Sequence, residues 1–435
     1  MANSAREAAL EALKRCRQTG TWSAVSVDMA ITKYALDRRD AALATVICLG
    51  TLQNCTLCDF YIDSYCSSKH LEPLIRDILR TGVYQILFMD KIPDSAAVNE
   101  AVALTKKHGY KRASGLVNAV LRKISDNKNS LDEIPGRGSA AYLSIKYSHP
   151  EWLAEKIISQ NGYDFAENFL KSNNIPAETC IQVNTNKTSQ HELEARFENA
   201  DIKYQKHEWL ENCLTVQGNV TALPGFSDGL FYVQDPAAFL AVEAAELKPG
   251  MNVLDACAAP GGKSFAAAIA MNNCGKITSC DIHEKKIRLI SEGAERLGLS
   301  IIHSETADAR VAREEQYDAV IADVPCSGLG VIRKKPEIRN KTANEIAGLP
   351  KIQSDILSNL SNCVKPGGVL LYSTCTVIKE ENEDVVNEFL SKNPSFSAEA
   401  FTIPHIGKVN SGMYTFWPNV DGTDGFFICK LRRSI

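Results

Sequence analysis

Apolar and polar positions follow three different patterns along the chain. In residues 1–140 apolar residues recur every three or four positions, which predicts helices over 2–17, 39–61, 70–88, 95–107 and 114–124. Residues 125–140 are polar and rich in proline and glycine, which is typical of a linker. Residues 141–230 mix both periods and predict helices over 150–160 and 164–173, followed by short strands such as 180–184. From residue 231 short apolar runs alternate with amphipathic stretches.

That alternation predicts strands over 251–254, 276–280, 300–304, 317–322 and 369–372, with helices between them such as 264–270, 284–297 and 351–363. Strands that alternate with helices form a mostly parallel, doubly wound sheet, whose ligands bind at the carboxyl ends of the strands. We therefore predict an α/β fold in three domains: a helical domain over 1–140, a small mixed α/β domain over 141–230 and the sheet domain over 231–435.

A glycine-rich turn follows the first of these strands, in the segment Asp255-Ala-Cys-Ala-Ala-Pro-Gly-Gly-Lys-Ser264. A strand, such a turn and a helix N-terminus make a corner that binds nucleotide-type ligands, because glycine lets the backbone approach the ligand closely. Asp281 and Asp308 end the next two strands and suit a ribose and an adenine. A P-loop is a poor alternative, since Cys257 stands where that motif requires its first glycine.

Two cysteines follow later strands of the predicted sheet, in Asp323-Val-Pro-Cys326 and Ser373-Thr-Cys375. Thiolate addition to C6 of a pyrimidine makes C5 nucleophilic enough to accept a methyl group, and a second group must then remove the C5 proton. An acid such as Asp323 would hydrogen-bond the ring at N3. Residue order alone does not assign the two thiol roles. Inert buried cysteines, or a redox pair that forms a Cys326–Cys375 disulfide, are the alternatives.

Composition narrows the class of protein. The chain has 435 residues, a net charge of −4 and 14 cysteines without a secretory signal, which favours a cytoplasmic protein with reduced thiols. No apolar run is long enough to predict a membrane span. Cys55 and Cys58 lack a second ligand pair, so we expect no metal. Any nucleic-acid surface must be local, and one basic cluster comprises Lys106, Lys107, Lys111, Arg112, Arg122 and Lys123.

The motifs of the C-terminal half together resemble the RNA cytosine-C5 methyltransferases of the RsmB/Sun/Fmu (NOL) family. The matching segments, in the family's order, are Gln234-Asp-Pro-Ala-Ala238, the glycine-rich turn, Asp281, Asp308, Asp323-Val-Pro-Cys-Ser-Gly-Leu-Gly330, Ser373-Thr-Cys375 and Asp424-Gly-Phe-Phe427. The first 130 residues resemble NusB-type RNA-binding domains through Leu71-Glu-Pro-Leu-Ile-Arg76, Val98-Asn-Glu-Ala-Val102 and Gly115-Leu-Val-Asn-Ala-Val-Leu-Arg122.

The resemblance implies a Rossmann-like methyltransferase domain, preceded by a NusB-like domain and a small RNA-binding middle domain. S-adenosylmethionine is the implied cofactor, held by Cys257, Ala258, Ala259, Pro260, Gly261, Gly262, Lys263, Asp281, Asp308 and Asp323. The implied catalytic residues are Cys375 as nucleophile, Cys326 as the group that assists elimination, Asp323 beside the base, and Lys263 as a partner for acids. Asn340 departs from the family, because an aromatic residue often follows Pro336-Glu-Ile-Arg339.

The implied substrate is one cytosine of 16S ribosomal RNA that is not fully assembled into the small subunit, modified by a cytoplasmic monomer. A methyltransferase for exocyclic amines would carry an aromatic residue after a proline pair, which Asp323-Val-Pro-Cys326 lacks. An RNA-binding assembly factor with an inactive sheet domain is the non-enzymatic alternative.

Overall fold

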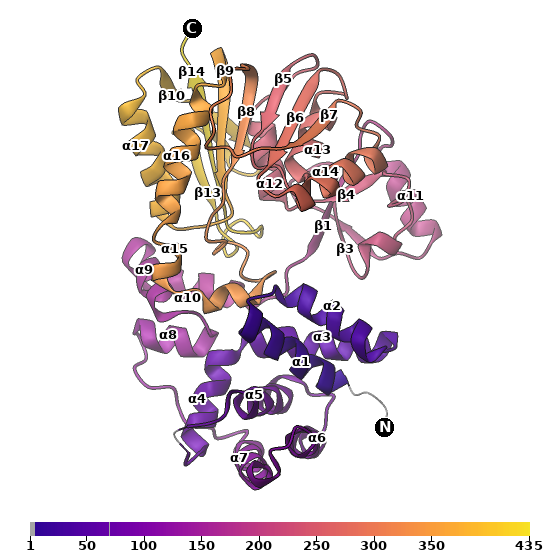
Figure 1. Ribbon diagram of the computed structural model, residues 1–435, viewed down its shortest axis with the longest axis vertical. Coiled ribbons are helices and arrows are strands. Elements are labelled where there is room, and N and C mark those ends of the chain that lie inside the picture. Colours follow the sequence, from indigo (N-terminus) through magenta and orange to yellow (C-terminus); the bar gives the residue numbers. More distant parts are fainter. Residues whose placement is uncertain (1–4, 69) are drawn as a thin grey trace. The chain divides into compact units, whose positions relative to one another are not determined.

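The computed structural model describes residues 5–68 and 70–435 and divides into two compact units. The first unit contains Met1–Pro176 and Ile332–Ala343, and the second contains Ala177–Val331 and Asn344–Ile435 (Figure 1). The predicted start of the first helix at Ala2 lies outside the described residues.

The first unit is helical. Its helices are α1 (Ala5–Thr19), α2 (Ser23–Tyr34), α3 (Arg38–Gln53), α4 (Cys55–Tyr65), α5 (Pro73–Phe88), α6 (Asp94–Lys107), α7 (Ser114–Asp126), α8 (Ala140–Tyr147), α9 (Glu151–Asn161) and α10 (Tyr163–Ser172). Leu10, Ile78, Leu79, Val83 and Leu121 are buried in its core. The unit extends past residue 140 and includes α8 to α10. The boundary predicted at residue 140, between the first two domains, stays a prediction.

The sequence pattern missed two features of this unit. The expected helix over 39–61 is two helices, α3 and α4, which meet at 76° around Asn54. The Asn54 side-chain amide donates to the Gly50 carbonyl (2.9 Å), a local bond that competes with continuation of the helix. Helix α2 was not predicted. In the described part of the chain no single helix is long and apolar enough to cross a membrane, although the bent α3–α4 pair meets the criteria of length and composition.

The second unit contains two main sheets. The smaller one has the order β2-β3-β1-β4 and is antiparallel, formed by β1 (Thr179–Val183), β2 (Tyr204–Lys206), β3 (Cys213–Val216) and β4 (Phe231–Val233). Helix α11 (Gln190–Asn199) accompanies it and begins with a capping box, in which Ser189 and Glu192 satisfy each other's backbone amides.

The larger sheet has the order β10-β14-β9-β8-β5-β6-β7, with β13 paired to β14. Its strands are β5 (Asn252–Asp255), β6 (Lys276–Asp281), β7 (Ile302–Thr306), β8 (Tyr317–Asp323), β9 (Val364–Thr374), β10 (Phe396–Ala398), β13 (Met413–Phe416) and β14 (Phe426–Arg433). Five neighbouring strands are parallel, as predicted: β9, β8, β5, β6 and β7. Strand β14 runs antiparallel to β9 and pairs with β10 and β13, an antiparallel extension that the alternation rule did not predict.

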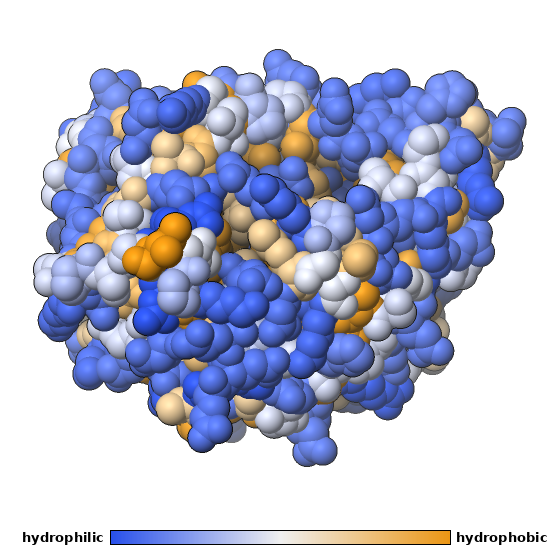
Figure 2. Space-filling model, turned by 90° about the horizontal axis from the view of Figure 1, so that it is seen from above, coloured by the Kyte–Doolittle hydropathy of each residue, from blue (hydrophilic) through white to orange (hydrophobic). Residues whose placement is uncertain are grey.

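Helices cover both faces of this sheet. Apolar side chains of α12 (Pro236–Ala244), α13 (Gly262–Ala270) and α14 (Glu284–Leu297) pack on one face, and those of α16 (Leu349–Ser361) and α17 (Glu383–Lys392) pack on the other. Buried residues alternate between the faces, as Leu370 and Leu371 of β9 do. Figure 2 shows a mostly hydrophilic surface on which hydrophobic residues form small, scattered patches.

Ile332–Ala343 leaves the sheet domain and belongs to the first unit. We call this segment the strap. It contains a short 3-10 helix, η3 (Pro336–Asn340), and in Figure 1 it is the orange segment among the indigo and magenta helices. Asn340, the departure from the family's pattern, is exposed, so no aromatic packing is missing at that position.

Candidate active site

The glycine-rich turn connects β5 to α13 and requires glycine at one position. Gly261 has φ +116°, and a Cβ on it would lie 2.4 Å from the Phe265 ring. Below the turn, Ser264 donates to Asp255 Oδ2 (2.6 Å) and lies 2.7 Å from Ser279 Oγ. Burial raises the pKa of Asp255 to about 7. This network fixes the base of the corner.

A cavity of about 320 Å³ opens at the carboxyl ends of β5, β6 and β7. Three of the predicted cofactor residues line it: Cys257, Asp281 and Asp308. Asp281 is buried and accepts from the His283 amide (2.9 Å), and Asp308 forms a bidentate pair with Arg310. The apolar part of the lining comprises Ala256, Ile282, Ala307, Ala309, Pro325, Ile352 and Ile356.

This donor set fits S-adenosylmethionine. Carboxylates can accept from ribose hydroxyls and the adenine amine, while the apolar side chains suit the faces of the purine ring. Residues 258–263 of the turn do not line the cavity; they shape the corner behind it. The cavity therefore supports part of the predicted cofactor set directly.

An ion pair between a buried lysine and a partly exposed carboxylate lies at the ends of β8 and α13. The Lys263 ammonium donates to Asp323 Oδ2 (2.7 Å), and the Ser373 hydroxyl donates to Asp323 Oδ1 (2.9 Å). Lys263 is 8% exposed, and its Nζ lies 4.9 Å from the centre of the Phe426 ring. Because both oxygens of Asp323 accept a hydrogen bond, the carboxyl group is held in one orientation.

The two cysteines that the sequence singled out lie together. Their sulfur atoms are 3.1 Å apart, and the Cys375 amide also points at Cys326 Sγ (3.3 Å). The hydrogen bond with Cys375 and burial raise the pKa of Cys326 well above its usual range. Cys326 is thus held as a thiol, which can donate to the sulfur of Cys375.

The loops that carry the two cysteines are bonded to each other at several points. The Ser327 hydroxyl donates to Thr376 Oγ1 (2.8 Å), and the Gly330 amide donates to the Cys375 carbonyl (3.0 Å). Gly330 also accepts from the Gly425 amide (2.9 Å), and a Cβ on Gly330 would lie only 1.8 Å from the Gly425 carbonyl oxygen. Such close backbone approach requires glycine in both loops.

Sequence reasoning missed two residues that support these loops. Glu381 is 1% exposed and accepts from the Ser327 amide (2.8 Å) and from the Gln353 side chain (2.9 Å). The same Gln353 amide donates to the Pro325 carbonyl (3.0 Å). Glu381 stands in an acidic run, Lys379-Glu-Glu-Asn-Glu383, which in sequence looks like an ordinary solvated surface. Only the tertiary fold shows that this acid is inside.

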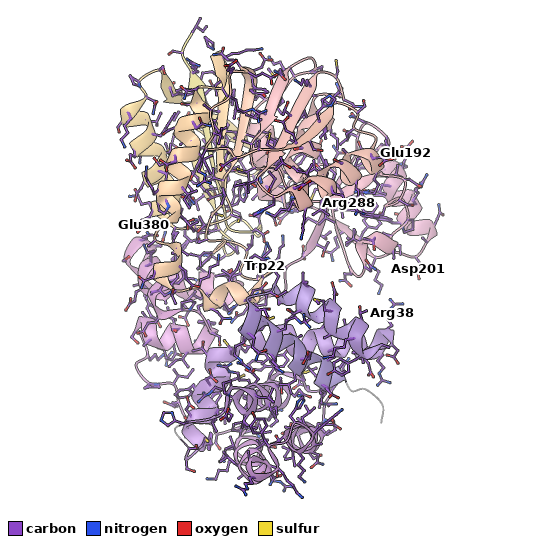
Figure 3. All side chains as sticks on the ribbon, in the orientation of Figure 1. Trp22, Arg38, Glu192, Asp201, Arg288 and Glu380 are labelled. Atoms are coloured by element: carbon purple, nitrogen blue, oxygen red, sulfur yellow. The ribbon has the colours of Figure 1, made fainter. Side chains whose placement is uncertain are left out.

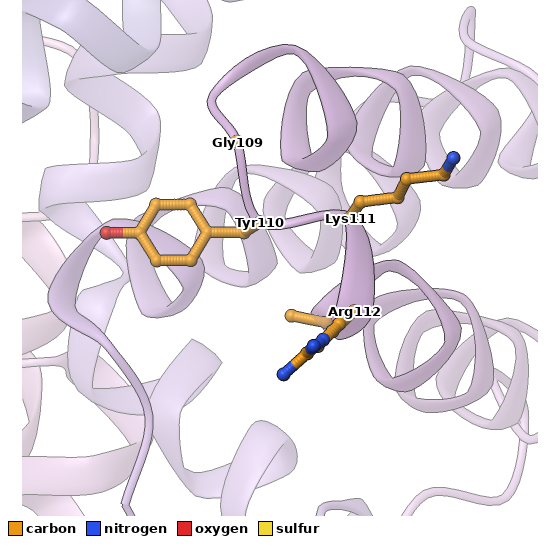
Figure 4. A pocket seen from close by; sticks show the side chains of 5 residues that line it. Gly109, Tyr110, Lys111 and Arg112 are labelled. Atoms are coloured by element: carbon orange, nitrogen blue, oxygen red, sulfur yellow. The ribbon is translucent and has the colours of Figure 1, made fainter.

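A second, basic site lies in the first unit. Gly109, Tyr110, Lys111, Arg112 and Ala113 line an open pocket of about 640 Å³ at the turn between α6 and α7. Figure 4 shows the side chains of Tyr110, Lys111 and Arg112 leaving the turn in different directions. Between residues 100 and 126 the sequence contains no acidic residue.

Within the predicted basic cluster, Lys107 already pairs with Glu7 (2.5 Å), so its charge is compensated. Lys111 and Arg112 are exposed. The cluster thus offers uncompensated positive charge at one turn, although the chain as a whole is slightly acidic.

Among the described residues no group of three His, Cys, Asp or Glu side chains could hold a metal ion. Cys58, which the sequence singled out with Cys55, is fully buried in α4.

Comparison with known proteins extends over all of these regions. Residues 242–432 match the 16S rRNA methyltransferase RsmB/F family, residues 3–126 match the NusB family, and residues 149–222 match the ferredoxin-like domain of RsmF/B-like methyltransferases. These matches confirm the predicted fold class: a NusB-like domain, a small mixed domain and a Rossmann-like methyltransferase domain.

Full-length relatives agree. The chain is 36% identical to the probable ribosomal RNA small subunit methyltransferase B of Bacillus subtilis (strain 168), over 99% of both chains. It is 31% identical to the ribosomal RNA small subunit methyltransferase B of Vibrio cholerae, over 91% of this chain and 90% of that one. The solved structure of PH0851 has a TM-score of 0.83 at 28% identity and covers 99% of this chain and 98% of that one. The chain belongs to the RsmB/F family of 16S rRNA methyltransferases.

Proposed function

We propose that this protein transfers a methyl group from S-adenosylmethionine to C5 of a cytosine in 16S ribosomal RNA, through a covalent bond between a cysteine and C6. The observation that carries the proposal is the pair of thiols 3.1 Å apart, at the end of the strand next to Asp323. The chemistry of C5 requires a nucleophile that forms the adduct and a second group that helps to resolve it, and the two thiols suit these roles.

Cys375 acts as the nucleophile in this proposal. Cys326 is the partner whose pKa is raised, so it keeps its proton and can stabilise a thiolate on Cys375 by donating to it. The Cys375 sulfur adds to C6 of the ring, and the electron pair of the C5–C6 double bond moves toward N3. Asp323, held in one orientation by Lys263 and Ser373, would donate to N3 in its protonated form as charge develops there.

S-adenosylmethionine supplies an electrophilic methyl group on its sulfonium sulfur. Once C5 has formed its new C–C bond, the C5 proton leaves to a base, the C5–C6 double bond forms again, and the C6–S bond to Cys375 breaks. Cys326, which keeps its proton until this point, assists the elimination in the proposal by protonating the departing sulfur of Cys375, while solvent water takes the C5 proton. Both cysteine loops must hold their geometry throughout, which is the role of the Ser327–Thr376 and Gly330–Cys375 bonds.

The RNA partner is proposed to bind partly through its phosphates. The turn around Lys111 and Arg112 supplies uncompensated positive charge, and phosphate contacts make affinity fall steeply with salt. A cytosine in a loop is the best target, because it can enter the site without first breaking a helix. A ribosomal RNA that still lacks part of its protein shell would leave such a loop accessible.

The proposal is tested by bisulfite sequencing of unmodified 16S ribosomal RNA after incubation with the protein and S-adenosylmethionine. We expect one protected cytosine, which disappears with Cys375→Ala. The matched control is Cys274→Ala, an exposed cysteine of the same unit that should leave protection intact. If methyl groups enter the RNA but no cytosine is protected, the C5 chemistry is wrong.

A second measurement separates the two thiols. With Cys326→Ala, RNA should remain attached to the protein after denaturation, because the adduct forms but elimination is slow. With Cys375→Ala no attached RNA is expected. The opposite pattern would exchange the two roles. If Cys375→Ala retained full function in cells, the assembly-factor alternative would be favoured instead.

A further inference from the structure

The strap follows directly from the loop that carries Cys326. Gly330 is bonded to the Cys375 carbonyl and to the Gly425 amide in the second unit. Two residues later the chain enters the first unit, where it stays from Ile332 to Ala343. The chain is therefore held at Gly330 by the cysteine loops, and from Ile332 onward it lies among the helices of the first unit.

Arg339 is the main attachment of the strap in the first unit. The side chain is 5% exposed, and its guanidinium donates to five oxygen atoms. The acceptors are the carbonyls of Gln53 (3.0 Å), Tyr147 (2.9 Å), Ser148 (3.0 Å) and Asn173 (3.0 Å), and the side-chain oxygen of Asn174 (2.7 Å). None of these acceptors is a carboxylate.

The acceptors share one property: they lie at helix C-termini. Gln53 ends α3, Tyr147 and Ser148 end α8, and Asn173 follows the last residue of α10. Terminal carbonyls lack partners inside their own helices and carry the negative end of the helix dipole. One cation thus satisfies the ends of three helices and joins them to the strap.

The histidine beside Arg339 does not add a second positive charge to this site. His149 lies 3.4 Å from the guanidinium, and its Nδ1 is 2.7 Å from the Tyr147 carbonyl. Burial and the neighbouring Arg339 lower the pKa of His149 well below its usual range, so the ring stays neutral.

Further contacts hold the strap along its length. The Ser23 amide and hydroxyl donate to the two oxygens of Glu337 (3.1 and 2.6 Å). The Lys335 ammonium lies 4.7 Å from the centre of the Trp22 ring, which Figure 3 labels. The Trp152 indole donates to the Lys341 carbonyl (3.1 Å). The attachment is therefore continuous from Lys335 to Lys341.

We propose that Arg339 is a positioning residue for methyl transfer: it fixes the strap in the helical unit and thereby holds the Cys326–Gly330 loop in its reactive geometry. The proposal rests on the proposed function for its kinetic part only. Small displacements of reacting groups lower rates strongly, so a loosened strap should slow the chemistry even when the cofactor and RNA still bind.

The test compares Arg339→Lys with Arg80→Lys. Lysine keeps the charge but cannot reach five acceptors with a planar fork. Arg80 is a matched control, since it holds Asp59 and Asp77 on α4 and α5 of the same unit but does not touch the strap. Two quantities are measured below the unfolding temperature of each variant: hydrogen exchange of the peptide around Gly330, and the single-turnover rate of methyl transfer to 16S ribosomal RNA.

We expect Arg339→Lys to speed exchange around Gly330 and to lower the single-turnover rate by about tenfold or more, while affinity for S-adenosylmethionine changes less than about twofold. Arg80→Lys should change neither quantity. Equal effects in both variants, or a lower rate without faster exchange, would show that Arg339 only stabilises the fold. Faster exchange with an unchanged rate would overturn the positioning role.

If Arg339→Lys does not fold, Ser23→Ala provides the second variant, because it removes the hydroxyl contact to Glu337 and leaves Arg339 in place. It should produce the same two changes on a smaller scale. The exchange measurement needs no methylation, so it tests the attachment of the strap even when wild-type protein transfers no methyl group. That last result would refute the proposed function rather than the attachment of the strap.

Discussion

Lys263 and Arg339 are both buried cations, yet their partners differ in kind. Lys263 pairs with one carboxylate, Asp323, whose side chain is 30% exposed. The oxygen atoms that accept from Arg339 are all neutral, and four of them are backbone carbonyls at helix ends. An ion pair at the edge of an open site can rearrange when a substrate arrives. A guanidinium surrounded by carbonyls cannot move without leaving several buried acceptors unpaired. The comparison separates a cation that serves chemistry from one that serves position.

Removing the Lys263 charge should affect the reaction most. In Lys263→Met we expect the single-turnover rate to fall about a hundredfold or more, because Asp323 loses the donor that orients it in the transition state. Stability should change by less than about 1 kcal/mol, since partly exposed Asp323 can be solvated. Rates and urea unfolding of this variant are compared with Lys276→Met, which breaks an exposed pair with Glu315. If Lys263→Met lost as much free energy of unfolding as of transition-state stabilisation, Lys263 would not differ from Arg339 in the way proposed.

Arg339→Met should show the opposite balance, with stability as the larger loss. Five acceptors would lose this donor, two of them on the buried residues Ser148 and Asn173, and we expect this to cost about 3–5 kcal/mol of unfolding free energy. Urea unfolding monitored by circular dichroism measures this loss. The matched substitution Arg288→Met removes an exposed arginine paired with Glu292 and should cost less than about 0.5 kcal/mol. If Arg339→Met lowered the unfolding free energy as little as Arg288→Met, the bonds from Arg339 to the helix ends would not anchor the structure.

The acid below the cofactor corner adds a pH dependence opposite in sign to that of His149 at the Arg339 site, because that histidine stays neutral in the folded state. Burial raises the pKa of Asp255 from its unfolded value near 4 to about 7, so between these values the folded state binds more protons than the unfolded state. The contribution of Asp255 to stability should therefore fall as pH rises from about 4 to 7, on the order of a few kcal/mol, and then level off. Burial lowers the pKa of Arg339 to about 10, outside this range.

Urea unfolding at several pH values checks this expectation, with Asp255→Asn as the test variant. The asparagine cannot ionise, so the decline in stability between pH 4 and 7 should become smaller. Glu243 is also buried with a raised pKa and remains in the variant, so part of the slope should persist. An identical slope in both proteins would assign the dependence to other groups.

The two cations also show what the sequence could and could not reveal. Lys263 stands in a motif, and the strand–turn–helix pattern of the chain is enough to predict its place. The same holds for Asp281, Asp308 and the cysteines, because local periodicity places strand ends and parallel strands bring their ends to one edge. The residues that support this edge, such as Glu381, come from segments with no local signal.

Arg339 belongs to the second kind. In the sequence it stands out only as part of a family-like run, and its acceptors lie on α3, α8 and α10, up to 286 residues away in the chain. No periodicity or spacing predicts that three helix ends will meet around one guanidinium. The helix break at Asn54 was missed for a related reason, since α3 must end there to present the Gln53 carbonyl.

The smallest expected effect concerns the basic turn of the first unit, where Lys111 and Arg112 form no ion pair with any residue in the described part of the chain. Lys111 and Arg112 are exposed at the pocket, and their substitution should leave the unfolding free energy within about 0.5 kcal/mol. In Lys111→Gln/Arg112→Gln, affinity for 16S ribosomal RNA should fall about tenfold at low salt. The slope of log affinity against log salt should decrease by about one to two, because two phosphate contacts are lost.

Filter binding across a salt series measures both quantities, with Lys285→Gln as the control for loss of an exposed charge in the second unit. An unchanged slope would place the phosphate contacts elsewhere. If Lys111→Gln/Arg112→Gln reduces the slope but leaves the single-turnover rate at saturating RNA unchanged, the exposed cations bind RNA without taking part in the reaction. In that case the three kinds of cation differ in role: the exposed ones bind the substrate, Arg339 holds the loop, and Lys263 alone among them acts at the reacting groups. Charge alone does not determine which of these roles a basic residue has; the partners of that charge do.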